Sequence, residues 1–170
     1  MKKVALIFAF IAVVLFSYDA YSQSKYQGEV SAGIALGVGN FSESRLIAET
    51  VHGLRFNENF FAGVGLGLHY YLGNDIGLSG TVMPLFFDVK GYYPVSSKLA
   101  PFASFDIGYG IGLGDINGDG AYFSPSIGMN VKMRWTDSMN FALSFHSQNF
   151  SNDGFSIAYN AIVFKVGIVF

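Results

Sequence analysis

Apolar side chains alternate with small or polar ones from Tyr26 to the end of the chain at Phe170. The clearest stretch runs from Phe123 to Trp135, with apolar residues on one face and Ser, Gly, Asn, Lys and Arg residues on the other. Successive side chains of a β-strand point to opposite faces, so this period of two predicts strands with one apolar and one polar face. In this region, no stretch reaches the roughly 18 consecutive apolar residues that a membrane-spanning helix needs.

Eight such stretches are separated by short clusters of Gly, Asn, Asp and Ser, which favour turns. In the last stretch, Phe155, Ile157 and Tyr159 are out of phase with the apolar residues that follow, which predicts a bulge in this strand. We expect strands at residues 26–39, 45–56, 59–72, 79–93, 99–113, 123–135, 138–150 and 155–170.

The charged residues avoid the apolar faces of these strands. Hydrophobic residues make up 51% of the chain and aromatic residues 17%, more than a typical soluble domain contains. A charged side chain facing the middle of a bilayer costs about 2–4 kcal/mol. Every charged residue after residue 22 falls in the N-terminal segment, in a connection or on the polar face of a strand. A soluble sandwich or lipocalin-like barrel would instead bury its apolar face and expose its charges. The pattern therefore predicts an all-β fold, an eight-stranded antiparallel transmembrane β-barrel.

The start of the chain has the pattern of a secretory signal peptide. Two lysines precede an apolar run from Val4 to Phe16, and the sequence Ala-Tyr-Ser then ends at Ser22. Its small residues occupy the positions that a signal peptidase reads. We expect a cleaved signal peptide at residues 1–22 and a barrel domain at residues 23–170. An uncleaved anchor helix is the alternative, but the apolar run is short for one.

The last strand ends the chain with alternating apolar residues. The sequence YNAIVFKVGIVF resembles the terminal strand by which outer-membrane β-barrels are recognised for assembly. The resemblance implies that the chain's partners are the barrel assembly machinery and the lipids of the outer membrane of a Gram-negative bacterium. The residues that would carry this assembly signal are Phe164, Val166, Ile168 and Phe170.

Three further segments, ETVHGLRFNENFFAGVGLGLHYY, MPLFFDVKGYY and PFASFDIGYGIGLG, are similar to the small outer-membrane β-barrel family, whose architecture is related to the OmpA and OmpX barrels. The resemblance covers nearly all of residues 26–170. It implies the fold and a location in the outer membrane, but it does not indicate an activity. An even number of strands puts both termini on the same side, which for this class is the periplasm. We find no periplasmic domain of the peptidoglycan-binding kind that OmpA carries, so we expect no tethering to the cell wall, and we expect a monomer.

The inside of an eight-stranded barrel is only wide enough to be filled by side chains or to hold one small ligand, so we expect no open pore. Glycines at a period of two, at Gly63–Gly67 and Gly108–Gly112, suit such a narrow lumen. Buried charges must be paired, so we interpret the inward charges as a structural salt-bridge plug, with an ion or ligand pathway as the alternative. The predicted network consists of Glu29, Glu49, Arg55, Asp88, Lys90, Asp106, Lys132, Arg134 and Lys165, with Arg45 on the same side.

Two histidines raise separate questions. Ser144 and His146, two residues apart on one strand face, resemble the His and Ser pair of outer-membrane lipid A deacylases, which are also eight-stranded barrels. That family has the motif His-x-Ser-Asn, whereas Ser147 directly follows His146 here. The period of two also directs His146 into the lumen, away from lipid acyl chains. His52 is expected on the lipid-facing side, where an interfacial role is favoured over catalysis.

An acidic connection offers a partial metal motif. Asp115, Asn117 and Asp119 copy the first half of a calcium-binding loop, but Ser126 stands where an EF-hand has its bidentate Glu. Acidic, glycine-rich connections commonly have this composition because they are turns. We therefore expect no complete metal site and no cofactor.

Three functions are considered. The sequence favours a non-enzymatic outer-membrane protein with a structural or interaction role in the cell envelope. The alternative is a barrel that binds or transports a small hydrophobic molecule, which would use the inward aromatic residues. A lipid A-modifying enzyme comes third, and the formal net charge of −2 indicates no nucleic-acid partner. The inward aromatic residues are Phe61, Phe86, Tyr92 and Phe102.

Overall fold

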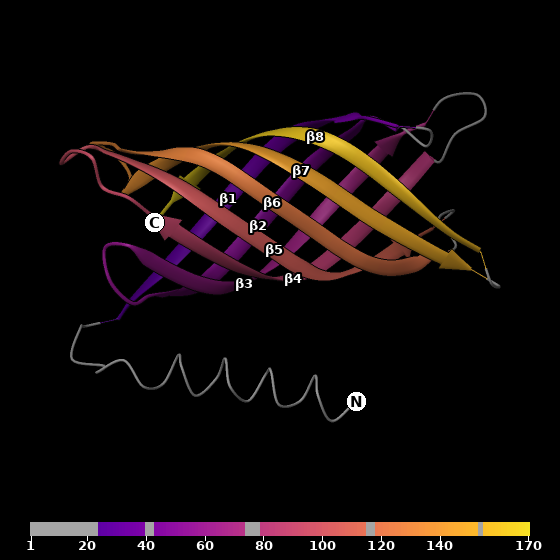
Figure 1. Ribbon diagram of the computed structural model, residues 1–170, viewed down its shortest axis with the longest axis horizontal. Helices are drawn as coiled ribbons and strands as arrows, with labels where there is room; N and C mark the ends of the chain where they lie inside the picture. The colour runs from indigo at the N-terminus through magenta and orange to yellow at the C-terminus, as the bar shows by residue number, and fades with distance from the viewer. Residues whose placement is uncertain (1–23, 40–42, 74–78, 115–117, 153–154) are drawn as a thin grey trace.

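The computed structural model describes residues 24–39, 43–73, 79–114, 118–152 and 155–170. These residues form eight antiparallel strands that close into one barrel in chain order, which confirms the predicted fold (Figure 1). The expected signal peptide lies outside the described residues. The strands are β1 (Lys25–Gly37), β2 (Arg45–Arg55), β3 (Phe60–Leu72), β4 (Ser79–Tyr92), β5 (Leu99–Leu113), β6 (Asp119–Lys132), β7 (Ser138–Asn152) and β8 (Phe155–Val169).

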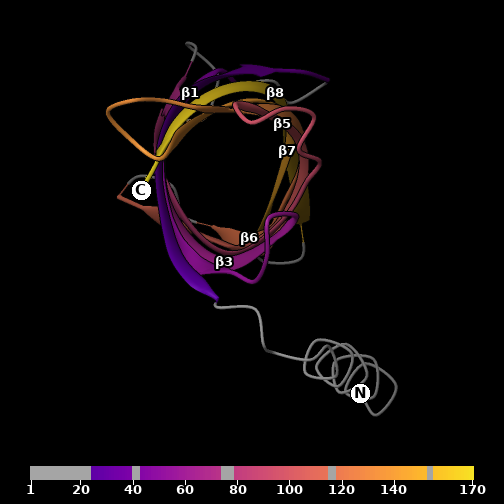
Figure 2. The same ribbon diagram turned by 90° about the vertical axis from the view of Figure 1, so that its left-hand side faces the viewer.

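The first and last strands close the barrel. β1 pairs with β8 from Glu29↔Val169 to Gly37↔Ala161. Beyond this ladder, the backbones of Gly28 and Phe170 exchange two hydrogen bonds of 2.7 and 2.9 Å. Figure 2, which looks along the barrel, shows β1 and β8 side by side in the closed ring. The C-terminal residue is therefore tied into the barrel wall, which leaves no open sheet edge at the junction.

The last strand is regular where a bulge was predicted. β8 pairs with β7 without interruption from Phe155 to Val169, so the predicted bulge is wrong. Ile157 and Tyr159 instead share the phase of the inward residues of β8. The ring of Tyr159 packs against those of Tyr71 and Phe150, at centroid distances of 6.1 and 5.5 Å. Apolar residues can change face here because this part of the lumen is itself filled by aromatic rings.

The two ends of the barrel differ. We call the end that carries the start of β1 and the end of β8 the terminal end, and the opposite end the loop end (Figure 1). Gly39, Gly73 and Gly114 begin three of the loop-end connections with φ angles of 93°, 52° and 71°, a region that favours glycine. β6 begins at Asp119, before the predicted start of this strand at residue 123.

The outer surface of the barrel is apolar. Phe87 and Ile127 point outward near the middle of their strands, and their side chains are 67% and 65% exposed. Tyr93 and Trp135, also exposed, add aromatic rings at the terminal end, as in the aromatic girdles of transmembrane barrels. Among the charged residues of the described strands, Asp119 alone has an outward position, at the loop-end rim. No helix in the described part of the chain is long and apolar enough to cross a membrane.

Candidate functional site

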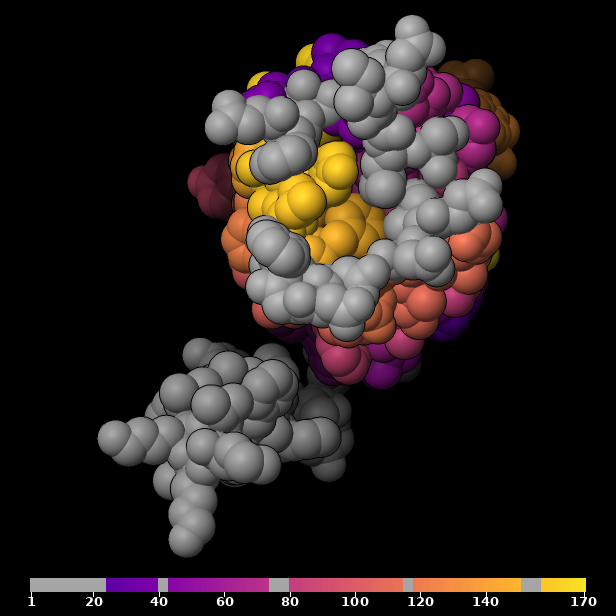
Figure 3. Space-filling view, turned by 90° about the vertical axis from the view of Figure 1, so that its right-hand side faces the viewer, coloured from indigo at the N-terminus to yellow at the C-terminus, as the bar shows by residue number. Residues whose placement is uncertain are grey.

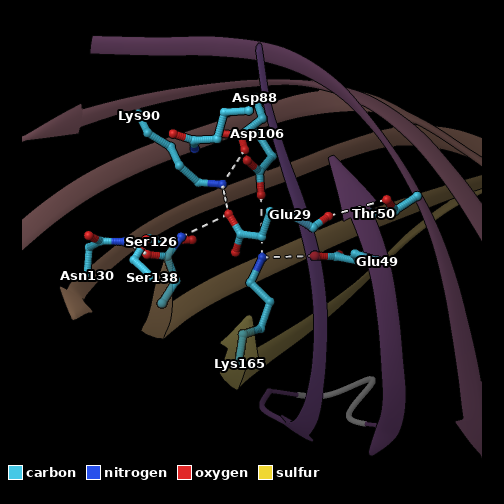
Figure 4. Close-up of polar contacts among 12 residues, drawn as sticks. Glu29, Glu49, Thr50, Asp88, Lys90, Asp106, Ser126, Asn130, Ser138 and Lys165 are labelled. Atoms are coloured by element: carbon cyan, nitrogen blue, oxygen red, sulfur yellow. Dashed lines mark hydrogen bonds and ion pairs between the residues drawn. The ribbon is translucent and has the colours of Figure 1, made fainter. Parts of the chain in front are cut away.

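Six charged side chains from five strands meet inside the barrel (Figure 4). Nζ of Lys90 lies 2.7 Å from Oε2 of Glu29 and 2.6 Å from Oδ2 of Asp88. Nζ of Lys165 lies 3.0 Å from Oε2 of Glu49 and 3.6 Å from Oδ2 of Asp106. Two ammonium groups thus hold four carboxylates, which leaves an excess of negative charge. We call this group the charge plug: Glu29, Glu49, Asp88, Lys90, Asp106 and Lys165.

A chain of amide and hydroxyl groups continues the charge plug toward the terminal end. Nδ2 of Asn140 donates a hydrogen bond of 2.9 Å to Oε2 of Glu29. Nδ2 of Asn130 donates to Oδ1 of Asn140 at 2.7 Å and to Oγ of Ser138 at 2.6 Å. All four side chains are buried, so these bonds satisfy polar groups that would otherwise be costly inside the barrel.

A second buried group adjoins the charge plug on its loop-end side. Nε2 of His69 lies 2.9 Å from Oε1 of Glu49, and the Tyr122 hydroxyl donates to the same oxygen at 3.3 Å. The rings of His69 and His146 stack with a centroid distance of 5.6 Å, and Tyr122 meets both rings edge to face. Glu49 therefore joins the two groups through its two oxygens. We call this group the histidine cluster: Glu49, His69, Tyr122 and His146.

Aromatic rings occupy the lumen near the loop end. The guanidinium of Arg45 donates to the Tyr71 hydroxyl at 3.0 Å and lies 4.9 Å from the centre of that ring. Phe150 and Tyr159 pack against Tyr71. Figure 3 looks onto this end, and atoms of β7 and β8, in orange and yellow, are visible within the opening.

The terminal end is more open. The guanidinium of Arg55 lies 4.4 Å from the centre of the Tyr92 ring and donates to Oε1 of Gln27 at 3.3 Å. A cavity of about 580 Å³ lies at this end, whereas the cavity inside the charge plug has a volume of about 20 Å³. The charged residues that line the larger cavity are Lys25, Arg55, Glu58, Lys98 and Lys132.

Six of the nine residues predicted to form the interior network are the members of the charge plug. Arg55 lies at the terminal end of the lumen, away from them. Lys132 is exposed at the last residue of β6, and Arg134 is exposed in the connection that follows. The prediction is wrong for Arg134 because the alternation was extended past the point where β6 ends. Lys132, the last residue of β6, lies outside the charge plug and lines the cavity at the terminal end.

The sequence interpretation missed His69 and Tyr122. His69 continues the period of two set by the inward glycines Gly63, Gly65 and Gly67, so its inward direction was available from the pattern. Tyr122 was missed because the strand was predicted to begin one residue later. The contact between His69 and Tyr122 across the lumen could not be predicted from the sequence, because it depends on the register of strands that are not neighbours.

Small residues make room for the large inward side chains. A Cβ atom at Gly65 would collide with the ring of Phe86, and one at Gly110 would collide with the side chain of Gln148. At Gly128, a Cβ would meet the ring of Phe102. Since interiors are close-packed, the inward glycines are spaces into which these side chains project.

The remaining candidates occupy different places. Ser144 and His146 both lie in the lumen, where Oγ of Ser144 accepts a hydrogen bond of 2.7 Å from Ser126. His52 lies on the outer face as predicted, bonded to the hydroxyls of Tyr26 and Thr50.

The calcium motif and the assembly signal can be placed only in part. Asp115 and Asn117 lie outside the described residues, and Asp119 is exposed at the start of β6. The four residues of the predicted assembly signal point outward from the C-terminal strand: Phe164, Val166, Ile168 and Phe170.

A closed eight-stranded barrel with an apolar outside and a charged, side-chain-filled lumen is the fold of the small outer-membrane β-barrels. The chain is similar to the crystal structure of Neisserial surface protein A (TM-score 0.62, 7% identity), covering 85% of this chain and 95% of that chain. It is also similar to the outer membrane enzyme PagL (TM-score 0.56, 15% identity), covering 82% and 98%. Identities this low show the fold alone. The sequence matches no protein-family model and no curated protein.

Proposed function

We propose that the protein is a non-enzymatic integral barrel of the outer membrane, with its terminal end in the periplasm and its lumen closed to ions. Its role in the cell envelope is then structural, or it interacts with other molecules through its loop end. The apolar outer surface and the aromatic rings at the terminal end support the placement in a membrane, because such a surface is stable only against lipid. The outward C-terminal residues support recognition by the barrel assembly machinery.

The charge plug is the observation that carries this proposal. Lys90 and Lys165 join side chains of five strands, and the cavity between them measures about 20 Å³. A volume of this size holds roughly one water molecule. Aromatic rings around Tyr71 fill the lumen on the loop-end side of the plug. A continuous water column, which ion conduction requires, has no room here.

The carrier alternative receives less support. The inward aromatic residues predicted to favour it are buried at 6% exposure or less and pack into one cluster with Val51 and Tyr122. The larger cavity, at the terminal end, is lined by four basic residues and is not an apolar pocket. A hydrophobic molecule would have to displace packed side chains to enter the lumen. The residues concerned are Phe61, Phe86, Tyr92 and Phe102.

The enzyme alternative also lacks a suitable pair of residues. A nucleophile needs a base within hydrogen-bond reach and access to its substrate. Ser144 bonds to Ser126, and the side chains of Ser144 and His146 are 3% and 0% exposed, so lipid acyl chains outside the barrel do not reach them. The similarity to PagL extends to the fold and supplies no argument for its activity here.

Planar-bilayer recording tests the closed lumen. The purified protein, inserted at single-molecule density, should give no steady ionic current above that of the lipid, while a general porin in the same bilayers gives stepwise currents. Folding is checked by the change in electrophoretic mobility that barrels show on heating. Stable current steps from the folded protein would contradict the proposal and indicate a conducting pathway.

Cysteine labelling tests the orientation, since the chain contains no cysteine of its own. Ser97→Cys places a thiol in the β4–β5 connection at the terminal end, and Val38→Cys places one directly after β1 at the loop end. A membrane-impermeant maleimide should label the Val38→Cys variant on intact cells and the Ser97→Cys variant only after the outer membrane is permeabilised. The reverse pattern would place the termini outside the cell.

A further inference from the structure

The histidine cluster brings four potential metal-ligand atoms together across the barrel. The donor atoms of Glu49, His69 and His146 all lie within 4.8 Å of one another, and the three residues are buried. The Tyr122 hydroxyl is 3.3 Å from Oε1 of Glu49 and 3.4 Å from Nε2 of His146. One carboxylate, two imidazoles and one phenol thus face a common point.

The spacing of these atoms approaches that of a tetrahedral site. Zinc binds nitrogen and oxygen ligands at about 2.0–2.2 Å, so two ligands of a tetrahedron are separated by about 3.3–3.6 Å. The two separations that involve Tyr122 lie in this range, and His69 and Glu49 are 2.9 Å apart. An ion between the four residues would require the His69–Glu49 pair to open by a few tenths of an ångström. It would also draw together the donor atoms of Glu49, His69 and His146, which lie within 4.8 Å of one another.

The histidines of the cluster have bonding capacity that the barrel does not use. Both ring nitrogens of His146 lie 3.4–3.5 Å from the Tyr122 oxygen, so neither is directed closely at it. Among the described residues, Nδ1 of His69 has no hydrogen-bond partner, although the side chain is fully buried. Nε2 of His69 faces Glu49, so its unpartnered Nδ1 points away from the centre of the cluster. Buried polar groups are normally satisfied, so the missing ligand is indicated by His146, whose ring nitrogens have only these long contacts.

The charge around the cluster suits a cation. The charge plug contains four carboxylates and two lysines, and counting Arg45 as a third base still leaves one formal negative charge. Lys165 binds Oε2 of Glu49 and leaves Oε1 directed at the histidines. A hydrogen bond of this kind, from Lys165 to the oxygen that does not bind the ion, fixes the orientation of a ligating carboxylate. The positive charge of Lys165 also repels the ion to some extent.

We propose that Glu49, His69, Tyr122 and His146 form a structural site for one divalent transition-metal ion, with Zn²⁺ the ion best suited to two nitrogen and two oxygen donors. Tyr122 binds as its phenolate and releases its proton to solvent when the ion enters. Four protein ligands leave no open position, which is typical of structural rather than catalytic zinc sites. The ligands come from β2 and β3 on one side and from β6 and β7 on the other. The ion therefore ties together two strand pairs that do not adjoin in the sheet.

Metal content after refolding tests the site. Untagged protein, refolded into detergent with Zn²⁺ or with a chelator, is dialysed and analysed for metal by mass spectrometry. We expect about one Zn²⁺ per chain and a melting temperature at least about 5 °C higher than that of the chelator-treated protein. Co²⁺ in place of Zn²⁺ should give the intense visible absorption of a four-coordinate ion.

The three histidines of the chain provide matched variants. His69→Gln and His146→Gln should each weaken Zn²⁺ binding by more than about 100-fold, whereas His52→Gln, on the outer face, should bind as the wild type does. Heat-dependent electrophoretic mobility reports whether each variant folds, and the Co²⁺ spectrum of the wild type tests the site independently of the variants. Absence of metal from the folded wild type, or equal retention by all three variants, would overturn the proposal.

Discussion

Nζ of Lys165 on β8 lies 3.0 Å from Oε2 of Glu49 on β2, although β1 separates these two strands in the sheet. The lysine side chain crosses β1 at Gly33, where a Cβ atom would stand 3.0 Å from Cγ of Lys165. The missing side chain at Gly33 is thus part of what allows the ion pair to form. The contact therefore links two strands that are not neighbours in the sheet.

Removing the Lys165 ammonium is expected to destabilise the barrel strongly. Lys165→Met keeps the length of the side chain but leaves Glu49 and Asp106 without their shared cation, and breaking a buried pair typically costs about 3–5 kcal/mol. Arg134→Met, at an exposed position outside the charge plug, should change stability by less than about 0.5 kcal/mol. The free energy of unfolding is measured with urea in lipid vesicles, using the fluorescence of Trp135.

A second substitution separates the charge effect from packing. Adding Glu49→Gln to Lys165→Met removes one of the two unpaired carboxylates, so the double variant should be more stable than Lys165→Met alone. If Lys165→Met unfolded at the same urea concentration as the wild type, the ion pairs of the charge plug would not contribute to stability.

The inward glycines give a test of packing. Gly65→Ala places a methyl group against the ring of Phe86 and should destabilise the barrel by about 1–3 kcal/mol. Gly91→Ala on the neighbouring strand β4, where no atom lies within 4 Å of the added Cβ, is the control and should lie within about 0.5 kcal/mol of the wild type. Gly65→Ala combined with Phe86→Leu should recover part of the loss. Equal stability of the two alanine variants would contradict close packing at Gly65.

The cost of adding a charge to the outer surface should depend on how deep the position lies in the membrane. Leu85 points outward in the middle of β4, so Leu85→Arg should cost about 2–4 kcal/mol in lipid vesicles. Tyr93, just beyond β4 at the terminal end, lies near the expected interface, and Tyr93→Arg should cost about 0–1 kcal/mol. Similar small costs for both substitutions would indicate that the barrel surface does not face hydrocarbon.

The sequence predicted the wall of the barrel well and its interior only in part. An outward charge is costly against lipid, so each strand must keep a period of two over its length, and this local pattern is readable without a structure. The contact between Glu49 and His69 joins neighbouring strands, but the approach of Tyr122 and His146 from the other side depends on how all eight strands are staggered. No local pattern contains that information.

The errors at Arg134 and Tyr159 have different causes. Arg134 has the correct parity for an inward residue but lies beyond the last paired residue of β6, where parity no longer determines direction. Tyr159 has inward parity and was assigned to a bulge because an apolar residue was not expected to face the lumen. The aromatic cluster with Tyr71 and Phe150 shows that the lumen changes from charged to apolar along its length.

The C-terminal residue allows assembly to be separated from stability. Phe170 is 49% exposed, and its backbone bonds to Gly28 do not depend on its side chain. Phe170→Ser should therefore lower the free energy of unfolding in vesicles only modestly, by about 1 kcal/mol. Val95→Ser, an exposed apolar residue in the β4–β5 connection, is the control for loss of apolar surface at the same end.

The two variants should differ in cells. If the terminal aromatic residue is the signal that the assembly machinery reads, Phe170→Ser should sharply reduce the amount of folded barrel in the outer membrane, whereas Val95→Ser should not. Quantitative immunoblotting of outer-membrane fractions, with unheated samples to count folded protein, measures this difference. Wild-type levels of folded Phe170→Ser protein would show that the outward position of Phe170 serves only the barrel wall, because the loss of its ring would then affect neither recognition nor insertion.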